Sequence, residues 1–137
     1  MALPFIDTNV ILRHITQDNP DHSARAFQFF QELETGNRTA TSTEGVLVEA
    51  VQVLSSRTLY HLPRGDIQAK LRPIIVLKGL KLAHKRVYLR ALDIYATTSL
   101  DFVDALLVTR AERSGNRTII SFDREFDGIP GVHREEP

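Results

Sequence analysis

The chain has 137 residues, 42% hydrophobic and 25% charged, a composition typical of one globular domain with a buried core. It contains no cysteine, which excludes disulfides, thiolate metal sites and cysteine nucleophiles. No apolar run approaches the ~20 residues of a membrane span, and the opening residues MALPFID are too short and wrongly flanked for a secretory signal. We therefore expect one cytoplasmic domain.

Short apolar and β-branched runs alternate with longer helical patterns along the chain. The short runs predict buried strands at residues 3–6, 39–41 and 118–121. The helical spacing of apolar residues predicts helices at about 20–35, 45–56, 64–72, 84–97 and 101–113. Strands that alternate with helices indicate an α/β domain with a mostly parallel sheet of four or five short strands.

Capping residues mark the ends of these helices. Gly36 follows the first helix and Gly115 the last, where a left-handed residue commonly ends a helix. Ser42 or Thr43 is expected to cap the second helix, and Ser99 the last one.

The 17 basic and 17 acidic residues balance overall, but they are unevenly distributed along the chain. Residues 57–90 carry nine cations against the single acid Asp66. Such a cluster is a candidate contact surface for a polyanion. The alternative is a set of solvated helix faces whose charges pair with acids of the flanking segments.

Two aspartates follow predicted strands. Asp7 ends the first strand run, and Asp123 follows the third with only Phe122 between them. Because ligands of parallel α/β sheets bind at the carboxyl ends of the strands, this position favours a functional role. The alternative is that each aspartate merely caps the helix that follows it.

Two further acids lie inside predicted helices, within strongly apolar sequence: Glu49 in VLVEAVQVL and Asp104 in FVDALLV. Helical spacing puts Glu49 beside Val46 and Val53, and it puts Asp104 beside Leu107. Both carboxylates therefore border faces that we expect to be buried. A buried carboxylate must be paired, protonated or metal-bound, so pairing with an arginine is the alternative to a metal site.

A cluster of carboxylates needs a cation. At ~5 Å two of them repel by about 3 kcal/mol at an effective dielectric constant of about 20. Oxygen ligands without cysteine favour Mg²⁺ or Mn²⁺ over Zn²⁺. A cation that activates water for attack on a phosphodiester is the chemistry that suits such a site.

Four motifs occur in order along the chain: DTNV at residues 7–10, Glu49 inside a helix, DFVDALLV at 101–108 and SFDREF at 121–126. Together they resemble the PIN-domain family, in particular the VapC toxins of toxin–antitoxin pairs. The resemblance implies a three-layer α/β/α sandwich with a short-stranded, mostly parallel central sheet, formed as one domain by residues 1–137. It also implies a Mg²⁺- or Mn²⁺-dependent endoribonuclease that forms a homodimer and is held inactive by a cognate antitoxin.

Matched residue by residue, the resemblance assigns a quartet that binds metal and activates the attacking water. This quartet consists of Asp7, Glu49, Asp104 and Asp123. Asn9 and Ser121 match polar positions that support the site, with Ser121 standing where threonine is frequent.

Four neighbouring acids leave the composition of the site open. Asp101 and Glu44 lie near helix starts, where a carboxylate favours the helix dipole. Glu125 and Asp127 are expected on a short exposed turn after Asp123, from which either could hold a second metal through water.

Among the cations, Arg86 and Arg90 lie one helical turn apart and are the expected contacts for RNA phosphates. The alternative for both is ordinary surface exposure.

Two other functions compete with the nuclease. A non-catalytic PIN-like RNA-binding module would be supported by a missing acid, but all four acids are present. A phosphoacceptor domain that clusters acids around Mg²⁺ wants an acid pair after the first strand and a lysine after a later one. Here Thr8 follows Asp7, and the run at 118–121 is followed by an aspartate and no lysine.

Overall fold

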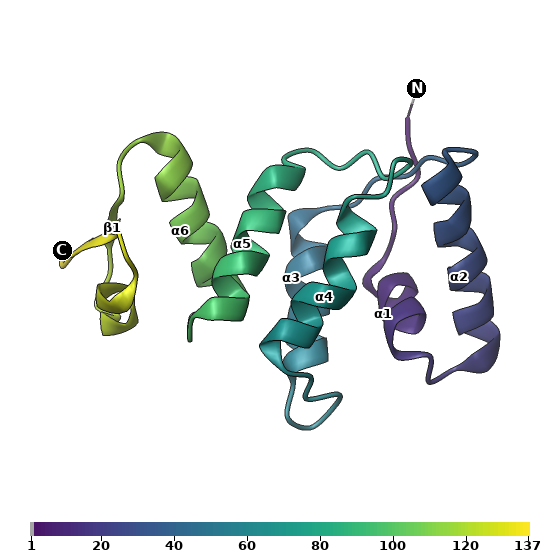
Figure 1. Cartoon of the computed structure of the whole chain (residues 1–137), viewed down its shortest axis with the longest axis horizontal. Helices are drawn as coiled ribbons and strands as arrows, with labels where there is room; N and C mark the ends of the chain where they lie inside the picture. Colours follow the sequence, from purple (N-terminus) through teal and green to yellow (C-terminus); the bar gives the residue numbers. More distant parts are fainter. Residues whose placement is uncertain (1) are drawn as a thin grey trace. The chain divides into compact units, whose positions relative to one another are not determined.

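The computed structural model describes residues 2–137 and divides into two compact units. The first unit ends at Lys85, and the second runs from Arg86 to Pro137. The first unit contains the helices α1 (Thr8–Thr16), α2 (Pro20–Thr35), α3 (Glu44–Ser55) and α4 (Arg64–Ile75). Helix α5 (Lys85–Thr97) begins at the boundary, and α6 (Phe102–Ser114), β1 (Thr118–Ile120), η1 (Arg124–Gly128) and β2 (His133–Glu135) follow it (Figure 1).

Helices α2 and α3 begin and end within one residue of the predicted bounds, whereas the predicted ranges did not include α1. Asn19 caps α2 by accepting the backbone N–H of His22, and Gly36 ends this helix with a φ of 80°. Thr43 caps α3 by accepting the N–H of Val46. Helix α4 starts after Pro63 and extends past the predicted residue 72, with Pro73 inside its last turn.

Parallel pairing in the first unit is limited to isolated bridges. Phe5 pairs with Thr41, and Ala40 pairs with Leu80. The segment around residue 40 therefore lies between the segments around residues 5 and 80. Gly79 is required here because a Cβ at this position would lie 2.3 Å from the carbonyl oxygen of Arg38.

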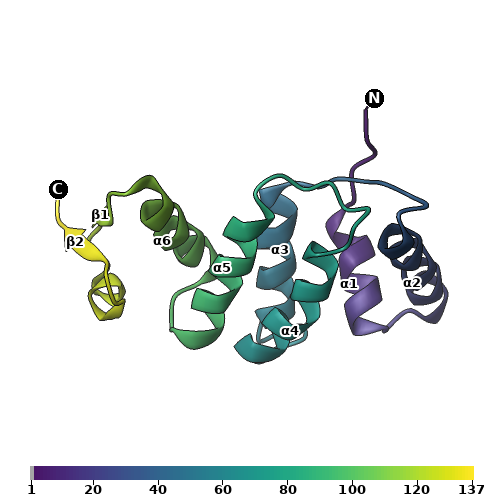
Figure 2. The same ribbon diagram turned by 45° about the horizontal axis from the view of Figure 1, so that its top comes forward.

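The core of the first unit forms between its helices. Helix α1 packs against α2 and α3, and α3 packs against α4 (Figures 1 and 2). The largest fully buried side chains of this unit are Leu33, Leu54, Ile67, Leu71 and Ile75. Burying each of these stabilises the unit by about 1.5–3 kcal/mol relative to exposure.

The second unit carries a two-stranded parallel sheet. Strands β1 and β2 pair in the register Thr118 to His133 and Ile120 to Glu135. The rings of Tyr95 in α5 and Phe102 in α6 meet edge to face, with centroids 6.1 Å apart. The predicted cap of α6 is wrong: Asp101, not Ser99, accepts the N–H of Asp104, because the helix begins at Phe102.

Helices joined by short parallel strand pairings confirm the α/β fold class. The formation of one domain by residues 1–137 stays a prediction. Across residues 2–137, the helices are too short or too polar to cross a membrane.

Candidate active site

The four predicted site acids are divided between the two units. Asp7 and Glu49 belong to the first unit, and Asp104 and Asp123 to the second. Over residues 2–137, the structure contains no group of three or more His, Asp or Glu side chains arranged to hold a metal ion. The surroundings of each acid therefore have to be examined within its own unit.

Asp7 both caps a helix and borders a groove. Its Oδ1 accepts the backbone N–H of Thr8 at 2.7 Å at the start of α1. The side chain is exposed, as is that of Asn9 one residue into the helix. Asp7 and Asn9 both line a groove of about 630 Å³ in the first unit. The capping alternative is thus realised, and it leaves the carboxylate accessible.

Glu49 is exposed, and the expectation that it borders a buried face is wrong. The buried stripe of α3 consists of Leu47, Ala50, Val51 and Leu54. Position 49 lies two residues from both Leu47 and Val51, which at helical spacing turns it away from this stripe. The apolar residues on either side of Glu49 misled the prediction because they are contiguous in sequence but not all on one face.

Asp104 is half-buried in the first turn of α6 and is surrounded by other acids. Burial raises the pKa of its carboxyl above the usual value, and the charges of Asp101, Asp123 and Glu125 raise this pKa further. The second unit therefore brings Asp104 close enough to Asp123 for their charges to interact. The acids left open by the sequence, Asp101 and Glu125, belong to the same electrostatic cluster.

Asp123 lies in the turn between β1 and η1. Its backbone N–H donates to Oγ of Ser121 at 2.9 Å, and its Oδ1 accepts the N–H of Glu125 at 2.9 Å. The predicted supporting role of Ser121 thus has a concrete contact. A second serine contacts the acids here: Oγ of Ser99 donates to Oε2 of Glu125 at 3.2 Å.

The groove beside Asp7 is rich in guanidinium groups. Its lining includes Arg13, Arg25 and Arg38, together with His22 and Phe29. The Arg38 guanidinium lies over the Phe29 ring, 4.8 Å from its centroid. Charge counting along the chain missed these arginines because they lie outside the cationic segment 57–90 and are spread among acids.

Each groove arginine has a carboxylate partner of its own in the first unit. Arg25 lies 3.7 Å from Asp21 and Arg38 lies 3.5 Å from Glu32, and these pairs are largely exposed. Exposed pairs of this kind contribute about 0–1 kcal/mol, so a phosphate can replace the carboxylate at little cost.

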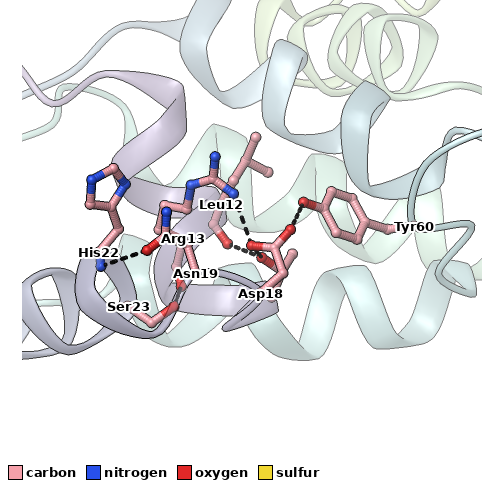
Figure 3. A network of polar contacts seen from close by, with 8 residues as sticks. Leu12, Arg13, Asp18, Asn19, His22, Ser23 and Tyr60 are labelled. Carbon is pink, nitrogen blue, oxygen red and sulfur yellow. Dashed lines mark hydrogen bonds and ion pairs between the residues drawn. The ribbon is translucent and has the colours of Figure 1, made fainter.

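Arg13 is held by a network around Asp18, which Figure 3 shows from close by. Its Nη1 donates to Oδ1 of Asp18 at 2.9 Å, and the Tyr60 hydroxyl donates to Oδ2 of Asp18 at 2.5 Å. The hydrogen bonds of Tyr60, Thr16 and Arg13 lower the pKa of Asp18 to about 2. The carboxylate therefore stays ionised and keeps the guanidinium at the edge of the groove.

The predicted phosphate contacts on α5 differ in their surroundings. Arg90 forms a two-point contact with Glu112, with Nε 3.2 Å from Oε2 and Nη2 3.1 Å from Oε1. Arg86 is exposed one turn earlier. Contact of either residue with RNA stays a prediction.

The structure is a parallel α/β fold in which carboxylates follow strand ends and lie at helix starts. The family model described as the PIN domain matches residues 5–132. The chain belongs to the PIN domain family, which confirms the resemblance drawn from its motifs.

The chain is also similar to a "VapC ribonuclease" from Aquifex aeolicus (strain VF5). The two sequences are 25% identical over 124 residues, which cover 90% of this chain and 90% of the relative.

Proposed function

We propose that the protein is a metal-dependent endoribonuclease and the toxin of a VapC-type toxin–antitoxin pair. The observation that carries the proposal is the crowding of Asp101, Asp123 and Glu125 around Asp104 within a chain of the PIN family. Carboxylates whose negative charges oppose one another suit a site that gains a divalent cation. The VapC relative supports RNA as the substrate.

The donor set fits a hard divalent cation because it consists of carboxylate oxygens. We assign the quartet of Asp7, Glu49, Asp104 and Asp123 as the residues that would hold Mg²⁺ or Mn²⁺. When bound, such a cation supplies positive charge against the phosphate and lowers the pKa of water.

The protein's own residues carry the remaining chemistry. One carboxylate of the quartet would accept the proton of the attacking water as the water oxygen bonds to phosphorus and the P–O bond to the leaving ribose oxygen breaks. The leaving oxygen takes a proton from solvent. Ser121 holds the backbone N–H of Asp123 and so orients this acid. Asn9, exposed one residue after Thr8, offers an amide to the same edge of the groove as Asp7.

The groove of the first unit supports binding of single-stranded RNA next to Asp7. Guanidinium groups bind phosphates, and the faces of aromatic rings bind bases. Arg25 and Arg38 supply the first kind of group and Phe29 the second. Arg86 and Arg90 are proposed as further phosphate contacts.

The proposal also includes a cognate antitoxin as partner, a homodimeric state and a cytoplasmic location. The VapC relative supports the antitoxin, which would have to cover the acids or the groove to prevent cleavage. Phe27 is 53% exposed on α2, and Phe30 of the same helix is buried, so the helix offers an apolar surface for such contacts. Light scattering of the purified protein with and without its antitoxin measures both assemblies.

Cleavage of a mixed pool of structured RNAs tests the activity. We expect cuts in Mg²⁺ or Mn²⁺ that disappear in EDTA and in the Asp7→Asn variant. Well-folded protein that binds the pool but does not cut it would instead support the non-catalytic RNA-binding module.

A further inference from the structure

Arg134 of β2 has an unusual place for an arginine, because its side chain is only 12% exposed. Its Nε donates to Oδ1 of Asp127 at 2.8 Å. Its Nη1 donates to the carbonyl oxygen of Ser121 at 3.1 Å and to Oε2 of Glu136 at 3.1 Å. One guanidinium thus satisfies three acceptors from three parts of the second unit.

Two of these acceptors lie on either side of Asp123. Ser121 follows β1 directly, and Asp127 lies in η1, so the guanidinium joins the two ends of the turn between them. The parallel register brings Arg134 beside Ile119, two residues before Ser121. The backbone pairing of β1 with β2 therefore sets the place from which the side chain reaches the turn.

The contacts of Arg134 with Ser121 and Asp127 restrict the conformation of the 121–127 turn, which contains Asp123. Inside it, the N–H of Asp123 donates to Ser121, and the N–H of Glu125 donates back to Asp123. Phe126 of η1 is 2% exposed, so burial of its side chain also holds the turn in place. The direction of the Asp123 carboxylate is consequently determined by backbone atoms whose positions depend on Arg134.

We infer that Arg134 is a positioning residue that holds the 121–127 turn so that Asp123 can serve as a metal ligand. The inference rests on the proposed function of Asp123. The planar guanidinium matters here beyond its charge, because Nε and Nη1 reach two acceptors at fixed relative positions. A lysine at this place keeps the charge but offers all its donors from one nitrogen, so it lacks the fixed, separated donors with which Nε and Nη1 reach two acceptors.

Hydrogen exchange of the metal-free protein tests the structural half of the inference. We expect faster exchange of the backbone amides from Ser121 to Asp127 in Arg134→Gln and Arg134→Lys. The control is Arg113→Gln, which removes the same charge at the exposed end of α6. Unchanged exchange in this turn would overturn the inference whatever the protein's activity.

Manganese binding tests the functional half. Residues that orient metal ligands change metal affinity by about 10–100-fold when substituted, so we expect a weakening of this size in Arg134→Gln and Arg134→Lys. Asp127→Asn changes an exposed residue at one end of the clamp and should weaken binding in the same direction. If the substitutions of Arg134 prevent folding, Asp127→Asn provides the second test.

The outcomes separate this inference from the proposed function. Wild-type affinity in Arg134→Lys would show that charge alone matters and would overturn the positioning role. Wild-type affinity in all three variants, with binding lost in Asp123→Asn, would overturn the inference and leave the nuclease standing. Wild-type protein that binds no Mn²⁺ would overturn the proposed function. In cleavage, positioning predicts a lower kcat with an unchanged KM for RNA.

Discussion

The two units of the protein hold their acids in opposite ways. In the second unit Asp104 is half-buried, and this burial, together with the charges of three other acids, raises the pKa of its carboxyl. In the first unit Asp7 and Glu49 are exposed, and Asp7 shares its groove with three arginines. The second unit thus gathers negative charge around one half-buried carboxylate, whereas the groove of the first unit mixes both signs on an exposed surface.

This difference suggests a division of labour under the proposed function. Crowded carboxylates favour a divalent cation, because each added negative charge makes the ionised form costlier without one. Mixed charges with weak ion pairs favour a polyanion, because phosphates can take the place of the carboxylates. We therefore expect metal binding to depend most on the second unit and RNA binding most on the first.

Removing one acid from each unit has the largest expected effect. Asp104→Asn and Asp7→Asn should each lower kcat by about a thousandfold, since the several kcal/mol that a bound cation supplies correspond to losses of this size. Single-turnover cleavage measures this. Glu34→Gln removes an exposed acid of α2 outside the groove and should leave cleavage unchanged. Full activity in Asp7→Asn would confine the site to the second unit.

Asp104→Asn should also raise the melting temperature of the metal-free protein. The pKa of Asp104 is raised in the folded state, so its ionised form opposes folding above this pKa and the opposition fades as the pH falls. Asp7→Asn should leave the melting temperature nearly unchanged, because an asparagine Oδ1 can accept the same Thr8 N–H and caps a helix about as well as aspartate. Equal melting temperatures for the two variants would remove the contrast between the units.

The packing of the first unit is most sensitive at Gly79. In Gly79→Ala the new methyl group meets backbone atoms of Arg38 and Leu33, at 2.3 and 2.7 Å, which cannot move aside like a side chain. We expect a loss of about 1–3 kcal/mol in the free energy of unfolding, or more. Gly65→Ala is the matched control, because nothing lies within 4 Å of its Cβ position. Urea unfolding of both variants decides the point.

The arginines of the groove and those of α5 can be compared directly. The double variant Arg25→Ala, Arg38→Ala should reduce the salt slope of single-stranded RNA binding by about 1.4 if each contacts one phosphate. Arg86→Ala with Arg90→Ala should have a smaller effect, since Arg90 is engaged by Glu112. Filter binding over a salt series measures both slopes. A larger change from the α5 pair would assign RNA binding to the second unit.

The smallest effect is expected at Tyr60. Its hydroxyl is the first cause of the pKa of about 2 at Asp18, so Tyr60→Phe should raise this pKa toward 3.8. A carboxyl whose pKa is lowered by folding stabilises the fold at pH values above its pKa in the unfolded state. The variant should therefore be less stable than the wild type at pH 7, and the difference should vanish as the pH falls toward 2. Carboxyl NMR titration and urea unfolding measure this. The effect should be absent in an Asp18→Asn background.

Local features of this chain were predictable from its sequence. Pro20 and Gly36 bound α2 as expected because their backbone preferences act within one turn of the helix. The parallel pairing of the segment near residue 40 followed from the alternation of strands and helices. The acids of the second unit were found because their motifs place them next to a strand end and a helix start.

Features that depend on distant contacts were not predictable. The network of Asp18 joins residues 42 positions apart, and the Arg134 clamp depends on the register of β1 against β2. The cap at Asp101 was assigned to Ser99 because both are good capping residues, and only the start of α6 at Phe102 distinguishes them. Exposure of Glu49 depends on which face of α3 is covered, which apolar composition does not reveal.

Calorimetric titration of metal-free protein with Mn²⁺ most directly tests the proposal that Asp7 and Asp104 are needed to bind a divalent metal. The account predicts saturable binding to the wild-type protein and its loss in both Asp7→Asn and Asp104→Asn. Wild-type affinity in either variant, or no binding by the wild-type protein, would contradict it.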